Sequence, residues 1–352
     1  MLIFAHLITH EDYMGRCLQL AKLGAGHVAP NPMVGAVLVY QDVIIGEGYH
    51  QQYGAAHAEV NCFNSVVPGM QNFISKSTLY VSLEPCSHFG KTPPCADLVI
   101  QKGVAKVVIA CRDPFEKVNG LGIEKLKAAG IEVIEGVLEK EAEELNKRFV
   151  TFYQKKRPYI FLKWAQTQDR FIARAGYERL AISNTYSNTF THKMRAEEAA
   201  ILVGTNTALH DNPALTTRNW VGKHPLRIVI DKHLKLPGTL NLFSDNHPTV
   251  VVNYLKEQQE GQIYFLKIAD KEDLLAQLMK YLYEHKIQSL IVEGGSILLS
   301  AFIAQNLWDE AVVITNKKLN IQQGLNAPEL PMKKLITAMA LSSDTIQRFR
   351  NR

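Results

Sequence analysis

One histidine, one glutamate and two cysteines between residues 57 and 95 have the side chains and spacing of a hydrolytic metal site. His57 and Glu59 are separated by one alanine, and Cys86 and Cys95 each follow a proline. An imidazole and two thiolates suit Zn²⁺, and a catalytic zinc ion keeps its fourth tetrahedral position for water. A carboxylate beside that water acts as its acid-base group. The pattern therefore predicts that His57, Cys86 and Cys95 bind zinc and that Glu59 is the catalytic residue.

The same residues resemble the signature of zinc deaminases that act on nucleobases, in which a His-x-Glu motif precedes a Pro-Cys motif and a second cysteine. That signature separates its cysteines by two residues, whereas eight residues separate Cys86 from Cys95. Two prolines before Cys95 stiffen the longer loop, and a helix that begins at Cys95 favours its thiolate through the helix dipole. The long loop is therefore compatible with both cysteines binding one zinc ion.

Length and composition indicate a soluble globular protein of two domains. The chain has 352 residues, of which 47% are hydrophobic and 21% are charged, and its net charge is +5. A mildly basic chain suits a small anionic substrate, and because the charges are scattered we expect no nucleic-acid partner. Five cysteines, two of them assigned to a metal, predict no disulfide framework. Since neither a signal peptide nor an apolar segment of membrane-spanning length occurs, we expect a cytoplasmic protein without membrane contact.

Strands and helices alternate along the first half of the chain, which predicts a layered α/β sheet. On the helix that carries them, His57 and Glu59 project in different directions, one to the metal and one past it to the water. We expect helices at 11–23, 122–129 and 139–149, and two more that begin at residues 57 and 95. We expect strands at 34–40, 43–48, 106–111 and 131–137, and one more that ends at residue 84.

The second half contains one local signal for anion binding. The strand at 289–293 leads into Gly294, Gly295 and a new helix, and backbone amides at such a helix start form an anion site. No Gly-x-Gly-x-x-Gly motif opens a strand-helix unit, which argues against a Rossmann domain. Lys163 interrupts an apolar strand, which is typical of a snorkelling or functional lysine. We expect strands at 159–164, 200–204, 227–230, 249–253 and 262–266, a loop at 205–218, and helices up to residue 200, at 271–285 and at 297–305.

Motifs in both halves resemble, in order, the bifunctional riboflavin-biosynthesis deaminase-reductase family. The first half contains Pro30-Asn31-Pro32-x-Val34-Gly35, Gly46-x-Gly48-x-His50, His57-Ala58-Glu59, the segment from Glu84 to Cys95, and Asp113-Pro114. The second half contains Lys163-x-Ala165-x-Thr167-x-Asp169, Arg195-Ala196-Glu197, residues 200–207, Asp211-x-Pro213-x-Leu215-Thr216-x-Arg218, and Glu293-Gly294-Gly295. The long cysteine loop is this family's own form. The resemblance implies an α/β chain with a cytidine-deaminase-like layered α/β/α domain at 1–153, a linker at 154–158, and a dihydrofolate-reductase-like α/β domain at 159–352.

For the first domain the resemblance implies a zinc-dependent deaminase of 2,5-diamino-6-ribosylamino-4(3H)-pyrimidinone 5′-phosphate. Bound zinc lowers the pKa of its water to about 7, Glu59 takes the proton of that water, and the ring amine leaves as ammonia. The positions that match the family's substrate-binding residues are Asn31, His50, His88, Lys91, Thr92 and Asp113.

For the second domain the resemblance implies an NADPH-dependent reductase that converts the ribosyl chain of the deaminated product to a ribityl chain by hydride transfer to C1′. The positions that match substrate-binding residues are Lys163, Ser183, Arg195, Asp211, Leu215, Arg218 and Glu293, with the two arginines holding the phosphate. The positions that match cofactor-binding residues are Ala165, Thr167, Asp169, Gly204, Thr207, Gly294 and Gly295.

The chain departs from the family in three places of this second half. Thr167 replaces a usual serine, Arg170 replaces a usual glycine, and Asn184 replaces a frequent threonine. The side chain of Arg170 would either crowd the cofactor or turn outward.

Two other interpretations use the same residues. A nucleoside or tRNA deaminase with a regulatory C-terminal domain is one, although such enzymes favour a short Cys-x-x-Cys loop that this chain lacks. A non-catalytic protein stabilised by structural zinc is the other, with His88, Cys62 or Cys111 as fourth ligand. The leading hypothesis is a two-site enzyme that binds a small phosphorylated pyrimidine together with Zn²⁺ and NADPH and that is able to form a homo-oligomer.

Overall fold

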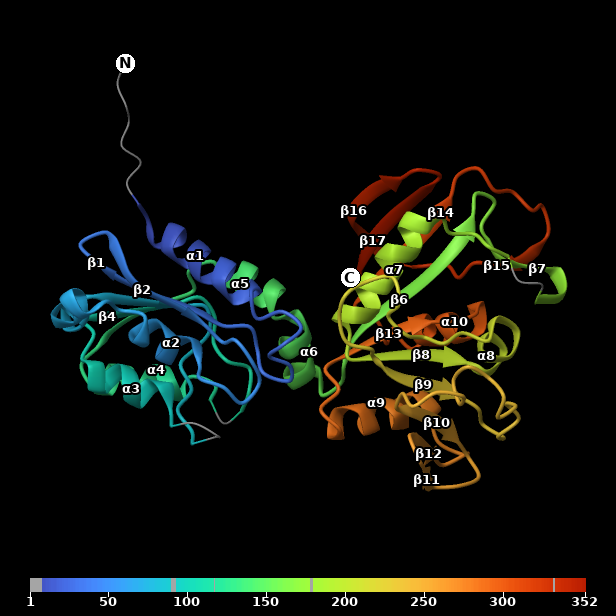
Figure 1. The fold of residues 1–352 in the computed structure, drawn as a ribbon, viewed down its shortest axis with the longest axis horizontal. Coiled ribbons are helices and arrows are strands. Elements are labelled where there is room, and N and C mark those ends of the chain that lie inside the picture. The colour runs from blue at the N-terminus through green and yellow to red at the C-terminus, as the bar shows by residue number, and fades with distance from the viewer. Residues whose placement is uncertain (1–7, 90–92, 117, 178–179, 332) are drawn as a thin grey trace, which may run out of the picture. The chain divides into compact units, whose positions relative to one another are not determined.

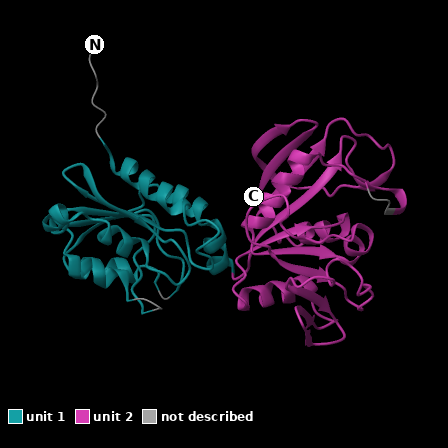
Figure 2. Ribbon diagram, in the orientation of Figure 1, with its two compact units in different colours: residues 1–155 teal, residues 156–352 magenta. Residues whose placement is uncertain are grey.

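The computed structural model describes the chain except for residues 1–7, 90–92, 117, 178–179 and 332 (Figure 1). The chain divides into two compact units, unit 1 with residues 1–155 and unit 2 with residues 156–352 (Figure 2). Strands and helices alternate in both units. The α/β class predicted from the sequence is therefore confirmed.

Unit 1 is a five-stranded sheet covered by helices on both faces. Its elements are α1 (His10–Lys22), β1 (Gly35–Tyr40), β2 (Val43–Tyr49), α2 (Ala58–Asn64), η1 (Pro68–Lys76), β3 (Thr78–Val81), α3 (Cys95–Lys102), β4 (Lys106–Ile109), α4 (Leu121–Ala128), β5 (Glu132–Glu135), α5 (Glu139–Leu145) and α6 (Lys147–Lys155). The strand order is β2-β1-β3-β4-β5, in which β1 is antiparallel to β2 and β3, and β3, β4 and β5 are parallel. Ala36 and Leu38 of β1 enter one buried cluster and Val37 and Val39 the other, as the two-residue period of a strand requires.

Two glycines let helices of unit 1 lie directly on the sheet. A Cβ atom at Gly48 would lie 2.2 Å from the Cys62 amide nitrogen of α2, and one at Gly35 would lie 2.0 Å from the Cys17 carbonyl oxygen of α1. No side chain fits at such separations, because they are shorter than any real contact of a Cβ atom with backbone. The close approach at Gly48 sets the position of the helix that carries the predicted catalytic glutamate.

The helix expected at 139–149 is interrupted at Asn146. The Asn146 side chain accepts the Met33 N–H through Oδ1 at 2.8 Å and donates to the Met33 carbonyl through Nδ2 at 2.9 Å. Asparagine side chains compete in this way with the regular hydrogen bonds of a helix. The break between α5 and α6 is therefore tied to the segment before β1, which contains Asn31.

Unit 2 is built on a ten-stranded sheet with a buried cluster on each face. Its elements are β6 (Tyr159–Thr167), β7 (Phe171–Arg174), η2 (Ala175–Tyr177), α7 (Thr185–Glu197), β8 (Ala200–Gly204), α8 (Thr205–Asp211), β9 (Leu226–Ile230), β10 (Thr249–Asn253), β11 (Gln258–Glu260), β12 (Ile263–Lys267), α9 (Leu274–Glu284), β13 (Ser289–Glu293), α10 (Ser296–Ala304), β14 (Glu310–Asn316), β15 (Gly324–Asn326), β16 (Lys333–Leu341) and β17 (Asp344–Asn351). The order is β11-β12-β10-β9-β8-β13-β6-β14-β17-β16, parallel from β12 to β14 and antiparallel at both ends.

Unit 2 differs from the sequence expectations in two regions. The loop expected at 205–218 begins with α8, because Gly204 ends β8 in an extended conformation and serves as the N-cap of a helix. The strands β14, β16 and β17 lie beyond the sequence expectations; β14 extends the parallel sheet next to β6, and β17 and β16 add an antiparallel edge. The other strands of the parallel sheet, from β12 to β6, follow the expected strands.

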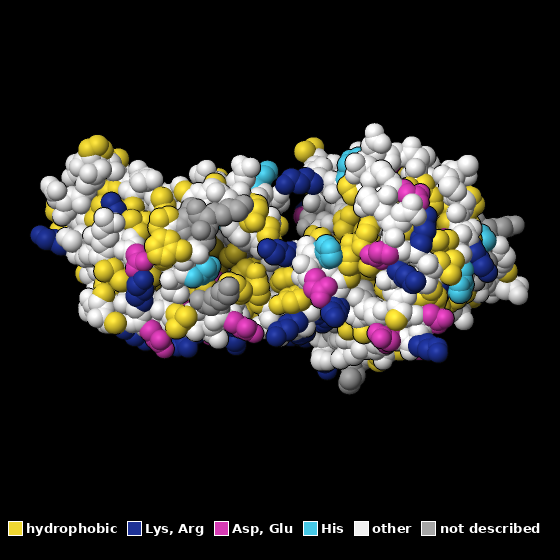
Figure 3. All heavy atoms as spheres, turned by 90° about the horizontal axis from the view of Figure 1, so that it is seen from below, with side chains coloured by type: hydrophobic (Ala, Val, Ile, Leu, Met, Phe, Trp, Pro, Cys, Tyr) yellow, Lys and Arg dark blue, Asp and Glu magenta, His cyan; other side chains and the backbone are white. Residues whose placement is uncertain are grey.

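Both signs of charge are mixed on the face of the molecule that Figure 3 shows, where Lys and Arg side chains lie beside Asp and Glu side chains in each unit. This distribution agrees with the scattered charges of the sequence. The described residues contain no helix that is both long and apolar enough to cross a membrane.

Candidate active sites

Three side chains of unit 1 converge on one point. The Nδ1 atom of His57 lies 3.6 Å from Cys86 Sγ and 3.3 Å from Cys95 Sγ, and the three ligand atoms all lie within 4.8 Å of one another. The three residues belong to different elements: His57 is the N-cap of α2, Cys86 follows β3, and Cys95 is the first residue of α3. The backbone N–H of Cys95 at that helix start also donates to Cys86 Sγ, at 3.3 Å.

This cluster has the donor set of a zinc site. Hydrogen bonding from Cys95 lowers the pKa of the Cys86 thiol to about 4, and the Cys86 sulfur in turn raises the pKa of His57. One nitrogen and two sulfur ligands leave a tetrahedral zinc ion one position for water. Within the part of the chain that the structure describes, this is the single cluster of metal-binding side chains, and Cys62, Cys111 and His88 lie outside it.

Glu59 lies beside the cluster in the first turn of α2. Its side chain is 3% exposed. Burial, together with the negative charge of Cys86, raises the pKa of Glu59 to about 7. A carboxyl group with a pKa near neutrality is able both to accept and to return a proton. His57 itself lies in extended backbone just before the helix, which is a small difference from the helix expected at that residue.

A cavity of about 240 Å³ opens beside the cluster. Its lining includes three residues of the predicted metal site, His57, Glu59 and Cys86, and several residues that the family resemblance assigns to the substrate, Asn31, His50, His88 and Asp113. The structure therefore brings these predicted residues to one place. Lys91 and Thr92, which the resemblance also assigns to the substrate, lie outside the described residues.

His50 positions Asn31 instead of offering a ring nitrogen to the cavity. His50 Nδ1 lies 3.0 Å from the Ala56 carbonyl oxygen, which only accepts, so Nδ1 carries a proton. In the neutral ring Nε2 is then an acceptor, and it lies 3.2 Å from Asn31 Nδ2. Burial lowers the pKa of His50, which favours this neutral form. Direct contact of a His50 nitrogen with substrate, as the resemblance implies, would require one of these two hydrogen bonds to open.

Glu84 is a site residue that the sequence analysis does not assign. Its buried carboxylate accepts backbone N–H groups at 2.9–3.3 Å from Asp113, Gly120, Gly122 and Ile123. These hydrogen bonds hold the cavity-lining segment against the Pro-Cys motif that Glu84 directly precedes. Burial raises the pKa of Asp113 at the start of this segment to about 7. The position of a carboxylate immediately before the Pro-Cys motif was the signal for this role.

Aromatic side chains form one wall of the same cavity. The Phe115 ring is T-shaped to His88, with centroids 5.7 Å apart, and lies 5.0 Å from Tyr153, which contacts Phe149 at 4.8 Å. Nδ1 of His88 is buried and has no hydrogen-bond partner among the described residues. Aromatic faces next to an unpaired polar atom suit a planar polar heterocycle. Phe115, Phe149 and Tyr153 are distant in sequence from the zinc motifs, and no sequence pattern marks them.

Unit 2 has a larger cavity, of about 760 Å³. Most of the residues that the resemblance assigns to the reductase reaction line it. They are Lys163, Ser183, Arg195, Asp211, Leu215, Arg218 and Glu293 for the substrate and Ala165, Thr207, Gly294 and Gly295 for the cofactor. These residues come from separate strands, helices and loops, so the fold brings together what the sequence presents as scattered motifs.

Glu293 pairs with two cations in this cavity. Its carboxylate accepts from Arg195 Nε at 2.9 Å and from Arg195 Nη2 at 2.8 Å, and it lies 3.6 Å from Lys163 Nζ. Burial by itself raises the pKa of Glu293, but the charges of Arg195 and Lys163 hold it at about 2. Burial also lowers the pKa of Lys163. The interruption of the apolar strand by Lys163 therefore has a structural explanation in this buried ion network.

Three expected cofactor residues, Thr167, Asp169 and Gly204, do not line the cavity. The Thr167 hydroxyl donates to Asp169 Oδ1 at 2.5 Å and accepts the Phe171 N–H at 3.0 Å. Asp169 Oδ2 accepts the backbone N–H groups of residues 321–322. Thr167 and Asp169 thus shape the turn between β6 and β7, and a cofactor contact of these residues stays a prediction.

Arg170 in this turn points outward. It has a φ of 66°, which is the left-handed region, and its N–H donates to the Thr167 carbonyl at 3.1 Å. Its guanidinium lies 3.6 Å from Glu329, and both side chains are exposed. A glycine suits this backbone conformation better than arginine does, but the arginine does not reach into the cavity lining.

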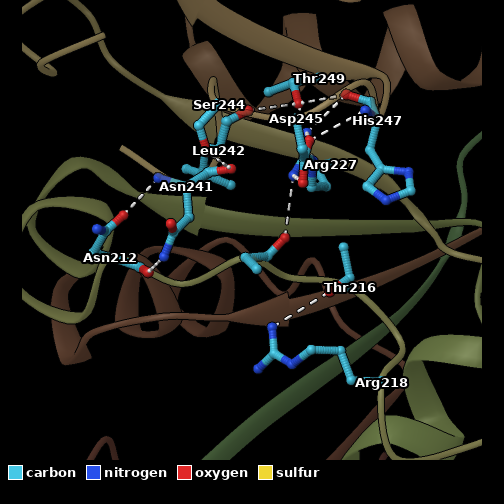
Figure 4. A network of polar contacts seen from close by, with 11 residues as sticks. Asn212, Thr216, Arg218, Arg227, Asn241, Leu242, Ser244, Asp245, His247 and Thr249 are labelled. Atoms are coloured by element: carbon cyan, nitrogen blue, oxygen red, sulfur yellow. Dashed lines mark hydrogen bonds and ion pairs between the residues drawn. The ribbon is translucent and has the colours of Figure 1, made fainter. Parts of the chain in front are cut away.

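The segment of residues 212–218, which carries Arg218, is held in place by a second unassigned residue, Arg227 of β9 (Figure 4). Arg227 is 1% exposed, pairs with Asp245 at 2.6 Å, and donates to the Ala214 carbonyl at 3.2 Å and to Thr249 Oγ1 at 3.0 Å. Such a fully engaged guanidinium fixes the backbone that it contacts. Arg227 therefore supports the Arg218 segment from the sheet.

Gly295 is the N-cap of α10, where the sequence predicts an anion site. Its N–H donates to Thr207 Oγ1 at 3.0 Å, so this amide already has a partner. A Cβ atom at Gly294 would lie 3.2 Å from the Leu298 side chain. Glycine therefore serves close packing here as well as access to the backbone.

Two family profiles match the chain, one in each unit. Residues 7–111 match the cytidine and deoxycytidylate deaminase zinc-binding region, and residues 158–319 match the RibD C-terminal domain. Among curated proteins, the riboflavin biosynthesis protein RibD of Aquifex aeolicus is 37% identical over 346 residues, which cover 96% of this chain and 95% of that protein.

Solved structures match the whole chain. A diaminohydroxyphosphoribosylaminopyrimidine deaminase/5-amino-6-(5-phosphoribosylamino)uracil reductase from Thermotoga maritima has a TM-score of 0.86 and 36% identity, with 97% of this chain and 98% of that chain covered. RibD of Acinetobacter baumannii has a TM-score of 0.87 and 30% identity at the same coverage.

Proposed function

This chain belongs to the RibD family of riboflavin-biosynthesis proteins, and from that membership we propose which residues perform each step of its two reactions. It is a bifunctional enzyme with a zinc-binding deaminase domain and a reductase domain that uses NADPH. The similarity extends over both halves of the chain, so it supports neither a nucleoside or tRNA deaminase with a regulatory domain nor a non-catalytic zinc protein.

The proposed boundaries are a deaminase domain at 1–153, a linker at 154–158 and a reductase domain at 159–352. The division of the chain into two units between residues 155 and 156 supports them. The match to the RibD C-terminal domain, which begins at residue 158, supports the start of the reductase.

The proposed substrate is 2,5-diamino-6-ribosylamino-4(3H)-pyrimidinone 5′-phosphate, a small phosphorylated pyrimidine. The Thermotoga maritima relative is a deaminase and reductase of phosphoribosylaminopyrimidine compounds, which supports this assignment. Deamination of the ring comes first, and reduction of the ribosyl chain to a ribityl chain follows.

In the deaminase reaction, zinc held by His57, Cys86 and Cys95 supplies Lewis-acid activation of water. Glu59 takes the proton of the attacking water and returns protons to the ring nitrogen and to the departing amine. The burial of Glu59 beside the cluster supports this role, because it keeps the carboxyl group away from bulk water.

The remaining groups of this cavity orient the pyrimidine. Asn31, whose amide is oriented by His50, and the unpaired Nδ1 of His88 bind the polar edge of the ring. Phe115 and Tyr153 contact the face of the ring. The combination selects a flat heterocycle that carries polar groups on its rim.

In the reductase reaction, NADPH supplies the hydride. Lys163, which Glu293 holds in place, binds the sugar at the reacting carbon. Arg218 has an exposed side chain in the cavity lining and binds the substrate phosphate together with the remaining N–H groups of Arg195. Asp211, Ser183 and Leu215 complete the substrate contacts.

One observation carries the proposal, namely the three ligand atoms within 4.8 Å of one another next to a buried glutamate. The test is an assay of the purified protein with the pyrimidine phosphate, in which ammonia and NADPH are followed separately. Glu59→Gln is expected to lower ammonia release by about 10²–10⁴-fold, with unchanged zinc content and unchanged NADPH oxidation on the deaminated substrate. Ammonia release at the native rate by this variant would contradict the role of Glu59.

A homo-oligomer is proposed from the edge of the ten-stranded sheet. The edge strand β16 is exposed along most of its length and carries Leu335 at 49%, Ile336 at 39% and Met339 at 43% exposure. An exposed apolar edge strand is a common site of pairing with another chain. Light scattering of the full chain tests this, and a cytoplasmic location without a nucleic-acid partner stays a prediction.

A further inference from the structure

We propose that His192 is a phosphate ligand of the reductase site, with Nδ1 held by the backbone of Arg218 and the Nε2–H group donated to the substrate phosphate. The proposal rests on the proposed function of unit 2 and deepens it, because His192 lies outside the residues that the family motifs assign.

The protonation of the His192 ring follows from one hydrogen bond. The backbone N–H of Arg218 donates to His192 Nδ1 at 3.1 Å. An N–H group donates only to a nitrogen without a proton, so Nδ1 is bare and the neutral ring carries its proton on Nε2. The backbone of Arg218 thus selects the tautomer of His192.

The surroundings of His192 keep the ring neutral. The residue lies on α7 and is 6% exposed. Burial lowers the pKa of His192, and the positive charges of Arg195 and Arg218 lower it further; the smaller effects of the Glu293 charge and of the Thr216 backbone act in the opposite direction. The ring is therefore an N–H donor through Nε2 near pH 7 and not a cation.

The Nε2 atom is the ring nitrogen of His192 for which the described residues provide no hydrogen-bond partner. Among the described residues, no hydrogen bond engages Nε2, yet this atom is absent from the buried side-chain atoms that lack a partner. Nε2 therefore reaches accessible space, and His192 lines the 760 Å³ cavity. A free donor in the wall of a substrate cavity is available to a ligand.

The neighbours of His192 make an oxyanion the fitting ligand. Arg195 and Arg218 line the same cavity. Glu293 already takes the Nε–H and one Nη2–H of Arg195, and the Thr216 carbonyl takes one Nη1–H at 3.4 Å, which leaves one N–H on each terminal nitrogen. Among the residues that the structure describes, the Arg218 guanidinium makes one contact, at 3.4 Å with Thr216 Oγ1, so most of its donors have no partner there. A phosphate monoester presents three terminal oxygens, which match a neutral N–H and the free donors of two guanidinium groups.

Two substitutions separate the two nitrogens of His192. In His192→Asn, the amide oxygen occupies the position of Nδ1 and keeps the Arg218 N–H bond, but the donor into the cavity is lost. In His192→Gln, the amide nitrogen reaches the position of Nε2 and keeps that donor, whereas the bond to Arg218 is weakened. Each variant is therefore the control for the other, because each keeps the hydrogen bond that the other loses or weakens. Ammonia release by unit 1 checks that the chain is folded.

The measurement is the reductase KM for the deaminated substrate with and without its 5′-phosphate. His192→Asn is expected to raise the KM for the phosphorylated substrate by about tenfold or more, as loss of a hydrogen bond to a charged group does. The KM for the phosphate-free substrate, the KM for NADPH and kcat are expected to stay unchanged, and His192→Gln is expected to raise the phosphorylated KM less. An equal rise with both substrates, or no rise with either, overturns the proposal.

A second measurement does not depend on turnover. In protein labelled with ¹⁵N-histidine, inorganic phosphate is expected to shift the Nε2 resonance of His192, which is assigned by its loss in His192→Asn. No shift at phosphate concentrations that saturate the site overturns the proposal. If the wild-type chain did not oxidise NADPH with the deaminated substrate, the proposed function would fail, and this titration would still decide the role of His192.

Discussion

The two sites of this chain differ in how far apart their parts lie in the sequence. The predicted zinc ligands and Glu59 all come from residues 57–95, and three of these residues, His57, Glu59 and Cys86, line a cavity of about 240 Å³. The charged residues of the reductase site come from positions between 163 and 293, and their cavity measures about 760 Å³. The reductase cavity is thus the larger of the two and draws its residues from more distant parts of the sequence.

The sites also differ in how they balance charge. In the deaminase site the buried Glu59 lies beside the cluster of His57, Cys86 and Cys95, in which the pKa of the Cys86 thiol is lowered to about 4, so the cluster attracts a cation. In the reductase site Glu293 is paired with Arg195 and Lys163, and the guanidinium of Arg218 has no ion pair among the described residues, so the site attracts an anion. The charge that each site lacks thus indicates the partner that it binds.

Metal removal is expected to separate the two sites most strongly. Chelation should reduce ammonia release to background, because the deaminase site has no internal replacement for the zinc ion. NADPH oxidation on the deaminated substrate should keep its rate. The measurement is both activities on one metal-depleted sample, with Zn²⁺ added back as control; loss of both activities would contradict the independence of the sites.

Breaking the ion network of the reductase site is expected to have the next largest effect. Glu293→Gln leaves the charges of Arg195 and Lys163 buried without compensation, and such a loss costs about 3–5 kcal/mol. The thermal transition of unit 2 should fall and NADPH oxidation should be lost, while ammonia release is retained.

The matched control for that substitution is Glu329→Gln, which removes a carboxylate from an exposed ion pair with Arg170. Such pairs contribute little, so both activities and both thermal transitions should stay the same. Equal destabilisation by the two substitutions would show that burial of the network is not the cause.

Moderate acid is expected to weaken unit 2 through two histidines. His192 and His224 each accept a backbone N–H of the 212–218 segment through Nδ1, from Arg218 and Thr217. Burial lowers the pKa of both rings below the ordinary histidine value of about 6.5. The unfolded chain therefore binds these protons at a higher pH than the folded chain, so the stabilisation is complete above pH 6.5 and is lost as the pH falls below it.

The measurement is the thermal transition of unit 2 between pH 7.5 and 5.5. The charged groups that surround the two rings are Arg195, Arg218 and Glu293 for His192, and His247, Arg227 and Asp245 for His224. The double substitution His192→Asn with His224→Asn should flatten the decline, because asparagine accepts the same N–H groups without titrating. A decline of native steepness in the double variant would assign it to other groups.

The smallest expected effect concerns Arg170. Its φ of 66° strains an L-residue, so Arg170→Gly should stabilise unit 2 by about 0.5–1 kcal/mol. Because the side chain points outward to Glu329, the KM for NADPH should not change. A lower KM in the glycine variant would show instead that the arginine crowds the cofactor.

Much of the fold followed from local patterns. The parallel strands at 200–204 and 249–253, the helix that begins at Cys95, and the glycine-capped helix after Glu293 lie where periodicity and capping predict them. The expectations of one continuous helix at 139–149 and of a loop that begins at residue 205 were wrong. The helix break at Asn146 depends on a distant contact, and the helix at 205–211 depends on a cap, and local propensity reveals neither.

The sequence by itself determined the chemistry of the metal site. A zinc site is defined by the types of its ligand side chains and by their spacing, and both can be read from the sequence for His57, Glu59, Cys86 and Cys95. Resemblance to a family then extended the assignment to the scattered reductase residues.

Only the tertiary structure decided which groups support those residues. Glu84, Phe115, Tyr153, His192 and Arg227 acquire their roles from partners that lie on other elements. The physical reason is that the side chain at one position does not specify which distant backbone amide, ring or carbonyl will face it. Strand pairing and helix packing set those contacts. They therefore also set the tautomer of His192 and the balance of positive and negative side chains in each cavity.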